Sequence, residues 1–176
     1  MKSIAISTMF FLYSLISVAA SEFELKGIKI GTSFESMDLE VFNCKKSVLD
    51  KTYSECNSLD NFTLAGKPAE MRIEFYEGKA YTMSATFKEL YYHDIVDAVV
   101  LKFGKPKSVS NRMLVNGFGV EYESKDVYWN NKHENIVIYQ MLNSVDVSLI
   151  SLSDNNEDKI EQKIKKKKVQ ESLNDM

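Results

Sequence analysis

Histidine and cysteine are scarce in this 176-residue chain, which has two of each, and this scarcity excludes most catalytic and metal-binding sites. The histidines, His93 and His133, are too far apart in the sequence to form a metal-binding spacing. His93 precedes Asp94, but adjacent helical side chains point apart, so they form no general-base pair. We therefore expect no catalytic residue, no metal site and no cofactor, and hence no enzyme.

The chain also has few prolines and no large excess of charge of one sign. Two prolines leave no proline-rich linker, while ten phenylalanines and nine tyrosines favour strands over loops. The apolar content of 44% and the charged content of 27% are typical of a globular protein. The 22 basic and 25 acidic residues give a net charge of −3, which does not favour nucleic acid, so we expect no nucleic-acid partner.

Long apolar runs are absent except at the N-terminus. Residues 4–20 form an uncharged apolar stretch of 17 residues behind Lys2, and Val18-Ala19-Ala20 precedes a polar segment. This pattern is typical of a secretory signal peptide cleaved after Ala20 or Ala19. The alternative, an uncleaved anchor, needs about 20 apolar residues. Position 21 is Ser21 and not cysteine, so we expect no lipid attachment and a soluble periplasmic or secreted protein.

The two cysteines lie close together. In an exported chain an isolated pair predicts a disulfide between Cys44 and Cys56, which would stabilise the fold by about 3 kcal/mol. The alternative, a redox-active pair, usually has a tighter Cys-x-x-Cys spacing. The eleven intervening residues are polar and indicate a loop.

The clearest fold signal is a two-residue alternation on both sides of Gly78. The apolar positions are Met71, Ile73 and Phe75 before the glycine, and Tyr81, Met83, Ala85 and Phe87 after it. This predicts a hairpin within residues 62–87 with one buried face. If Phe75 faces Tyr81, the numbers of paired residues sum to 156. The loop must then contain an odd number of residues, most simply the three residues Glu77–Lys79.

Helical signals flank this hairpin. Thr32 with Glu35 forms a capping-box pattern and predicts a short helix through about Phe42, after a first strand over residues 25–31. Residues 91–103 carry an apolar stripe of helical period that ends at Gly104. This helix should cover the apolar face of the sheet.

The remaining chain predicts four more strands and a charged end. A loop or edge covers residues 107–116, and strands are expected over 118–123, 127–129, 134–141 and 145–152. The domains are therefore a signal peptide (1–20), one α+β domain (21–153) and a Lys-rich tail (154–176). We expect an antiparallel sheet with helices packed on one face, plus a charged C-terminal helix or tail.

Three groups of residues are candidates for binding. Tyr91, Tyr92 and Trp129 predict a protein-binding surface, with core packing as the alternative. Lys165, Lys166, Lys167 and Lys168 predict weak contact with an anionic membrane surface, with a solvated tail as the alternative. Glu121 and Glu123 share one face of a strand; a glycosidase pair would need this, but a solvated face is the simpler interpretation.

Short motifs between residues 27 and 106 resemble those of small exported bacterial proteins. They are Gly27-x-x-x-Gly31-Thr32-Ser33, then Thr63-Leu64-Ala65-Gly66-Lys67-Pro68-Ala69, and Lys102-Phe103-Gly104-Lys105-Pro106. The chain is similar here to the SmpA/OmlA (BamE-like) group and to the beta-lactamase inhibitory protein. The resemblance implies a helix-plus-sheet module that binds other proteins. The chain departs from the BamE-like pattern in lacking a lipidated cysteine and in its extra strands and tail.

These observations predict a non-catalytic protein-binding module of the cell envelope. The expected partner is another envelope or secreted protein. The alternative is an inhibitor or immunity protein against a secreted hydrolase or toxin, because residues 21–153 carry 19 acidic against 15 basic residues and would suit a basic enzyme. The oligomeric state does not follow from the sequence.

Overall fold

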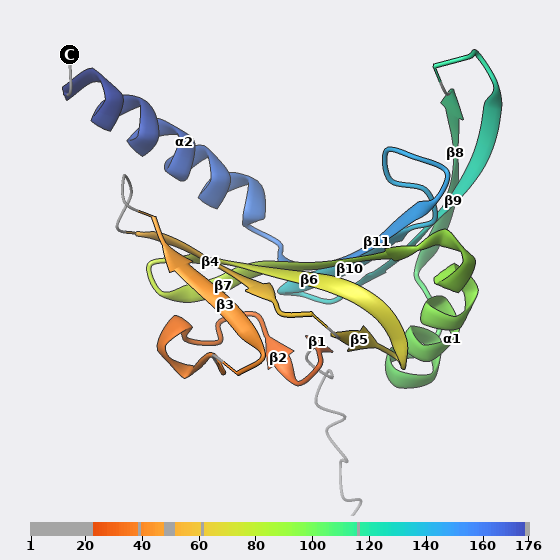
Figure 1. Cartoon of the computed structure of the whole chain (residues 1–176), viewed down its shortest axis with the longest axis horizontal. Coiled ribbons are helices and arrows are strands. Elements are labelled where there is room, and N and C mark those ends of the chain that lie inside the picture. Colours follow the sequence, from red (N-terminus) through yellow and green to blue (C-terminus); the bar gives the residue numbers. More distant parts are fainter. Residues whose placement is uncertain (1–22, 39, 48–51, 61, 116, 175–176) are drawn as a thin grey trace, which may run out of the picture.

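One long antiparallel sheet organises the molecule (Figure 1). The computed structural model describes residues 23–174 apart from 39, 48–51, 61 and 116, so the predicted signal peptide lies outside the described residues. The strand order is β3-β4-β6-β7-β11-β10-β9-β8, with β5 paired to β6. The strands are β3 (Phe42–Lys46), β4 (Tyr53–Ser58), β5 (Thr63–Leu64), β6 (Lys67–Tyr76), β7 (Lys79–Lys88), β8 (Ser108–Val115), β9 (Glu121–Asn130), β10 (Glu134–Tyr139) and β11 (Val147–Asp154).

The remaining elements are short, apart from two α-helices. A small hairpin joins β1 (Glu24–Leu25) to β2 (Ile28–Lys29), and 3-10 turns η1 (Phe34–Ser36) and η2 (Glu89–Tyr91) connect longer elements. The helices are α1 (Tyr92–Phe103) and α2 (Glu157–Asn174). The first strand expected over residues 25–31 is thus a hairpin, whose turn places Lys26 and Gly27 at positive φ.

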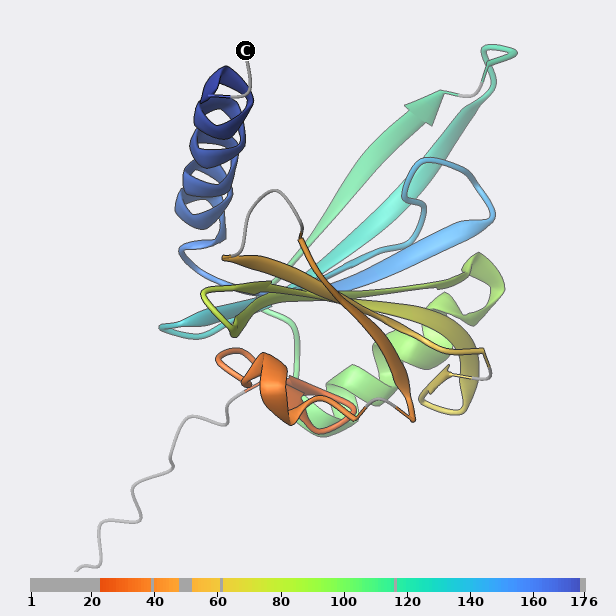
Figure 2. The same cartoon turned by 60° about the vertical axis from the view of Figure 1, so that its left-hand side comes forward.

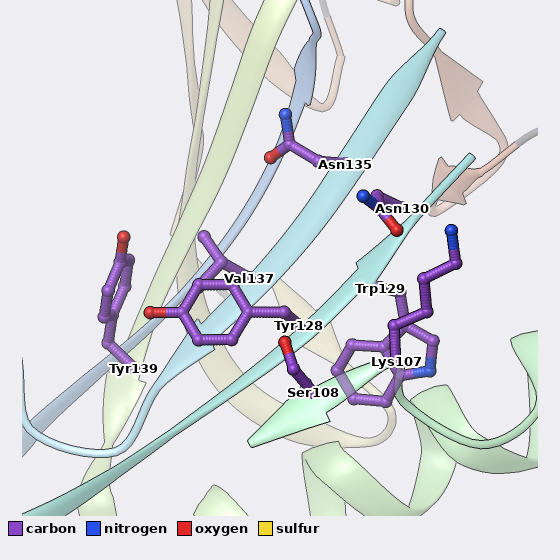
Figure 3. Close-up of a pocket in the computed structure, with 8 residues that line it drawn as sticks. All are labelled: Lys107, Ser108, Tyr128, Trp129, Asn130, Asn135, Val137 and Tyr139. Atoms are coloured by element: carbon purple, nitrogen blue, oxygen red, sulfur yellow. The ribbon is translucent and has the colours of Figure 1, made fainter. Parts of the chain in front are cut away.

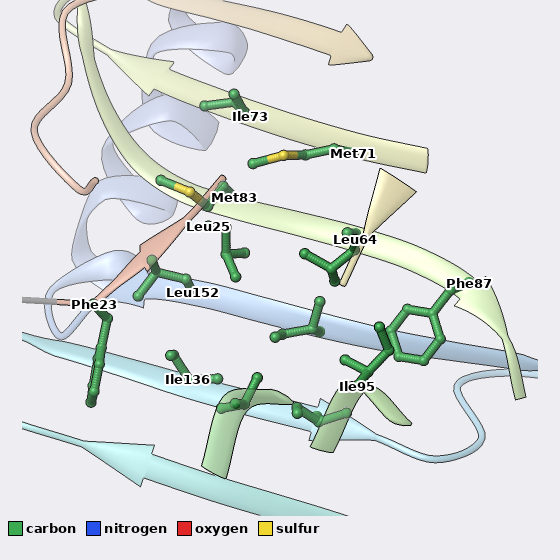
Figure 4. Packing of buried hydrophobic residues seen from close by; sticks show 14 of the residues in the cluster. Phe23, Leu25, Leu64, Met71, Ile73, Met83, Phe87, Ile95, Ile136 and Leu152 are labelled. Atoms are coloured by element: carbon green, nitrogen blue, oxygen red, sulfur yellow. The ribbon is translucent and has the colours of Figure 1, made fainter. Parts of the chain in front are cut away.

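The core lies on one face of the sheet, here called the core face (Figure 4). Directly opposed residues share a face, and one such row runs through Ile73, Met83, Leu152, Ile136 and Trp129. All five are at most 3% exposed. Helix α1 and the β1–β2 hairpin close this face, and the opposite side is here called the outer face.

The expected α+β domain with helices packed on one face is wrong. Strands account for 49% of the structure and helices for 24%, so the antiparallel sheet dominates. The two helices also lie on opposite sides: α1 packs on the core face, whereas α2 rises from the outer face (Figures 1 and 2). Helix α2 begins where β11 ends and leaves the sheet as it proceeds.

The helix expected from Thr32 to about Phe42 is reduced to the single turn η1. The Thr32 hydroxyl accepts a hydrogen bond from the backbone of Lys29, so it stabilises a turn and not a helix N-terminus. Met37 returns to an extended conformation (φ −70°, ψ 136°). Phe42 is buried in β3 instead, because ladder bonds to β4 replace those of a helix.

The hairpin register is right and the predicted loop is wrong. Ile73 faces Met83, and paired numbers sum to 156 through most of β6 and β7. The turn, however, has two residues, Glu77 and Gly78, both at positive φ. A bulge in β7 then leaves Tyr81 without a directly opposed residue on β6, and Phe75 faces Ala80. The bulge restores the shared apolar face that an odd loop would also have produced.

The predicted disulfide is confirmed, although its surroundings differ from the expected loop. Cys44 and Cys56 are bonded across directly opposed positions of β3 and β4. Such a bond fits an oxidising compartment. Helix α1 is confirmed as well, with Gly104 at a positive φ of 84° as its C-cap.

Candidate protein-interaction surface

A long hairpin formed by β8 and β9, here called the arm, projects from the end of the sheet (Figures 1 and 2). Strand β8 is the last strand of the sheet, so one side of it carries no neighbouring strand among the described residues. Its eight residues pair with β9 in a regular register without a bulge. Of the two alternatives predicted for residues 107–116, the edge strand is therefore the one observed.

The free edge of β8 carries exposed apolar side chains. Val109, Met113 and Val115 are 52%, 56% and 63% exposed, and they project on the same face as the core. Natural proteins usually protect such an edge with lysines, prolines or bulges, because open edges recruit other strands. Strand β8 has none of these.

The one charge of β8 is turned inward, away from the edge. Arg112 Nε lies 3.0 Å from Asp126 Oδ2, and the guanidinium also donates to the backbone oxygen of Met141. It lies 5.7 Å from the ring centroid of Tyr139. The Asp126 side chain is only 3% exposed, so the carboxylate of this ion pair is largely desolvated. The pair joins the two strands of the arm, and the hydrogen bond to Met141 ties the arm to the rest of the sheet.

The connection after β10 completes this anchor. The Ser124 hydroxyl donates to Asp126 Oδ1 at 3.4 Å and accepts from the backbone of Met141 at 3.1 Å. Ser124 is fully buried although it is polar. The base of the arm is therefore held by a connected polar network.

Two carboxylates flank the apolar residues on the distal part of the arm. Glu123 is directly opposite Met113, and Glu121 is directly opposite Val115. Both carboxylates are exposed, as expected for a solvated strand face. At the tip, Phe118 is 94% exposed between two glycines.

A hollow of about 390 Å³ lies at the base of the arm, here called the tyrosine hollow (Figure 3). It is lined by Tyr128, Trp129, Asn130, Asn135, Val137 and Tyr139 together with Lys107 and Ser108. Tyr128 faces Val137 on the outer face, and Tyr139 lies on the same face of β10. Burial raises the pKa of Tyr139 above its usual value.

The three aromatic residues predicted as a recognition surface do not gather on one. Tyr92 is 1% and Trp129 is 3% exposed, so the core alternative holds for both. The Tyr92 hydroxyl donates to the Lys125 backbone oxygen, and Trp129 Nε1 donates to the Gly104 oxygen, each at 2.8 Å. Burial raises the pKa of Tyr92 to about 12. Tyr91 is half-buried against the core, and its ring centroid lies 5.3 Å from the Lys67 ammonium.

The predicted lysine run lies on α2. All four lysines are exposed; Lys167 donates to the Thr52 hydroxyl, and Lys168 lies 5.0 Å from the ring centroid of Tyr53. Among the helix residues whose side chains the structure describes, only Ile164 is buried, and Val169 is 61% exposed. The helix therefore lacks the broad apolar face that enters a lipid surface. Neither α-helix in the described part of the chain is both long and apolar enough to span a bilayer.

The two histidines lie on the surface, far apart in the sequence. His93 and His133 are exposed, on α1 and in the turn before β10. Within the described ranges no group of three or more metal-ligating side chains comes together.

Comparison of the chain with protein-family models, with curated proteins and with solved structures returned no match.

Proposed function

We propose that this protein is a soluble, non-catalytic protein-binding module of the periplasm or the cell envelope. The observation that carries the proposal is the open edge of β8. An exposed edge strand can accept an extended segment of another protein as an additional strand, with main-chain hydrogen bonds for affinity and side-chain pockets for specificity. The arm is anchored before any partner binds, which lowers the entropic cost of binding.

The charge of the arm indicates which segment would fit. An added strand would pack its alternate side chains beside Met113 and Val115, with β9 about 10 Å away across β8. Lysine or arginine at those positions would reach Glu121 and Glu123. We therefore propose a partner segment in which apolar and basic residues share one face.

A second copy of this chain satisfies this requirement less well. The β8 residues on the face of Met113 include no basic side chain, because Arg112 projects to the other face. A copy of β8 would thus bring apolar residues but no cation to the two carboxylates. Charge complementarity favours a different protein.

The test uses capture of partners from periplasmic extract by the full chain and by Met113→Lys. The inserted lysine protects the edge, and we expect capture to fall at least about tenfold. Leu101→Lys is the matched control, since Leu101 is 88% exposed on α1 and the change of charge is the same. Hydrogen exchange of the captured complex should show new protection of β8 amides.

Equal loss of capture in both variants, or unchanged exchange in β8, would contradict the proposal. Dimers that form with increasing protein concentration, and that Met113→Lys prevents, would instead identify a second copy as the occupant.

The tip of the arm favours a second candidate function, inhibition of a secreted hydrolase or toxin. Phe118 is the most exposed apolar side chain of the described residues and lies in the connection between β8 and β9, the strands of the projecting arm. Such a residue can enter a substrate cleft. Inhibition that Phe118→Ala abolishes and Met113→Lys does not would support this candidate over strand addition.

A further inference from the structure

The tyrosine hollow differs in chemistry from the arm beside it. Its lining includes two tyrosines, two asparagine amides, one serine hydroxyl and one ammonium group, but no carboxylate. The body of the protein is acidic, so the absence of carboxylates from this lining is a local feature. We infer that the tyrosine hollow binds a sugar unit of a neutral or acidic glycan.

The floor of the hollow can carry one face of a sugar ring. Val137, which is 8% exposed, lies between the half-buried Tyr128, directly opposite it on β9, and Tyr139, two residues further along β10 (Figure 3). The face of an aromatic ring is electron-rich and attracts the weakly positive C–H groups on the apolar side of a pyranose. Arg112 contacts the Tyr139 ring and is itself fixed by Asp126, so the platform is ordered before a ligand arrives.

The rim of the hollow supplies hydrogen-bond partners for hydroxyl groups. Asn130 and Ser108 are exposed and offer both donors and acceptors, and Lys107 adds donors only. The Asn135 amide is held in place, because its oxygen accepts from Ser153 and its nitrogen donates to Asn155. A ligand that alternates donors and acceptors along its edge matches this rim.

A peptide is the main competing occupant, and the sheet argues against it. Strand β9 is paired on both sides, by β8 and β10, and β10 is paired by β9 and β11. The floor therefore has no open ladder to satisfy a peptide backbone. A sugar needs no such ladder, since side chains can satisfy its hydroxyl groups.

The experiment titrates the full mature chain, labelled with nitrogen-15, with chitohexaose, maltohexaose and hexagalacturonate at millimolar concentrations. We expect saturable shifts of the amides of Ser108, Tyr128 and Asn130 with at least one of these sugars. Tyr128→Ala should weaken this binding by about tenfold, because it removes half of the platform. Asn130→Ala, at an exposed position that does not threaten folding, should weaken it as well.

Tyr122→Ala is the matched control, because Tyr122 lies on the same strand and face as Tyr128 but outside the hollow. It should leave sugar binding unchanged. The inference is overturned if none of the three sugars shifts these amides, if Tyr128→Ala binds as the wild type does, or if an apolar-basic peptide shifts them instead. Met113→Lys should leave sugar binding intact and Tyr128→Ala should leave partner capture intact, so this inference and the proposed function can fail separately.

Discussion

The two edges of the sheet are built in opposite ways. Strand β3 has five residues, of which Lys45 and Lys46 are charged, and a disulfide joins it to β4. Lys46 also pairs with Glu35 at 3.0 Å and lies 5.1 Å from the centroid of the Phe34 ring, so η1 packs beside this edge. Strand β8 has eight residues, and its one charge is turned inward.

This difference shows that the protein protects one edge and leaves the other open. Short strands and lysines are the usual means of preventing edge-to-edge association. Because both means are present at β3 and absent at β8, the open edge is a local property and not a general feature of this sheet. The proposed function depends on this contrast.

The largest expected effect concerns the ion pair that anchors the open edge. Arg112→Met should lower the free energy of unfolding by about 3 kcal/mol, because it leaves the buried Asp126 carboxylate without its cation. Lys107→Met removes an exposed lysine just before β8 and should change the free energy of unfolding by less than about 0.5 kcal/mol. Urea unfolding measures both, and equal effects would show that the pair does not anchor the arm.

A similar effect is expected at the protected edge, through the disulfide. Replacing Cys44 and Cys56 together by alanine should cost about 3 kcal/mol, because the unfolded chain is no longer constrained. Reductant should destabilise the wild type and leave the double variant unchanged in thermal unfolding. A wild type insensitive to reductant, with the bond shown to be reduced, would contradict this.

A smaller effect, on binding and not on stability, distinguishes the edges directly. Val115→Lys should reduce partner binding at least about tenfold, whereas Asn43→Lys on the exposed side of β3 should not change it. Both variants should unfold within about 0.5 kcal/mol of the wild type, since both positions are exposed. Equal loss of binding by Asn43→Lys would mean that general charge, and not the β8 edge, controls association.

The smallest expected effect concerns an exposed ion pair near the protected edge. A hydrogen bond from Arg72 holds the pKa of Glu55 below its usual 4.5. As the pH falls below about 4.5 the unfolded chain takes up this proton first, so the stabilisation present at neutral pH is lost on acidification. Because the pair is partly exposed, the loss should be under about 1 kcal/mol. Glu55→Gln should remove this part of the pH dependence in urea titrations between pH 3 and 7.

Local signals predicted part of the fold correctly. The stripe and Gly104 located α1, and the alternation around Gly78 placed Ile73 opposite Met83. The bulge at Tyr81 was missed because a two-residue turn plus a bulge and a three-residue loop give the same alternation. Strand β3 was missed because its two lysines obscure any alternation, and it forms through pairing with β4.

The candidate site was predicted less well than the fold. Tyr92 and Trp129 were candidates for an exposed surface, but periodicity alone cannot show that both are buried in the core between α1 and the sheet. The Arg112–Asp126 pair was also missed. In the register of the arm Ser110 faces Asp126, so Arg112, two residues further along β8, lies on the same face as Asp126. This relation becomes visible only when residues 108–130 are recognised as one hairpin.

The sequence by itself determined the features that depend on neighbouring residues and on composition. With only two cysteines, the pairing of Cys44 with Cys56 had one solution, and the period of residues 91–103 specified a helix. Only the tertiary structure decided that β8 is an outermost strand, that Arg112 turns inward and that the two helices take opposite faces. These features depend on the order of strands far apart in the chain, and that order follows from burial of the whole core, which no local pattern encodes.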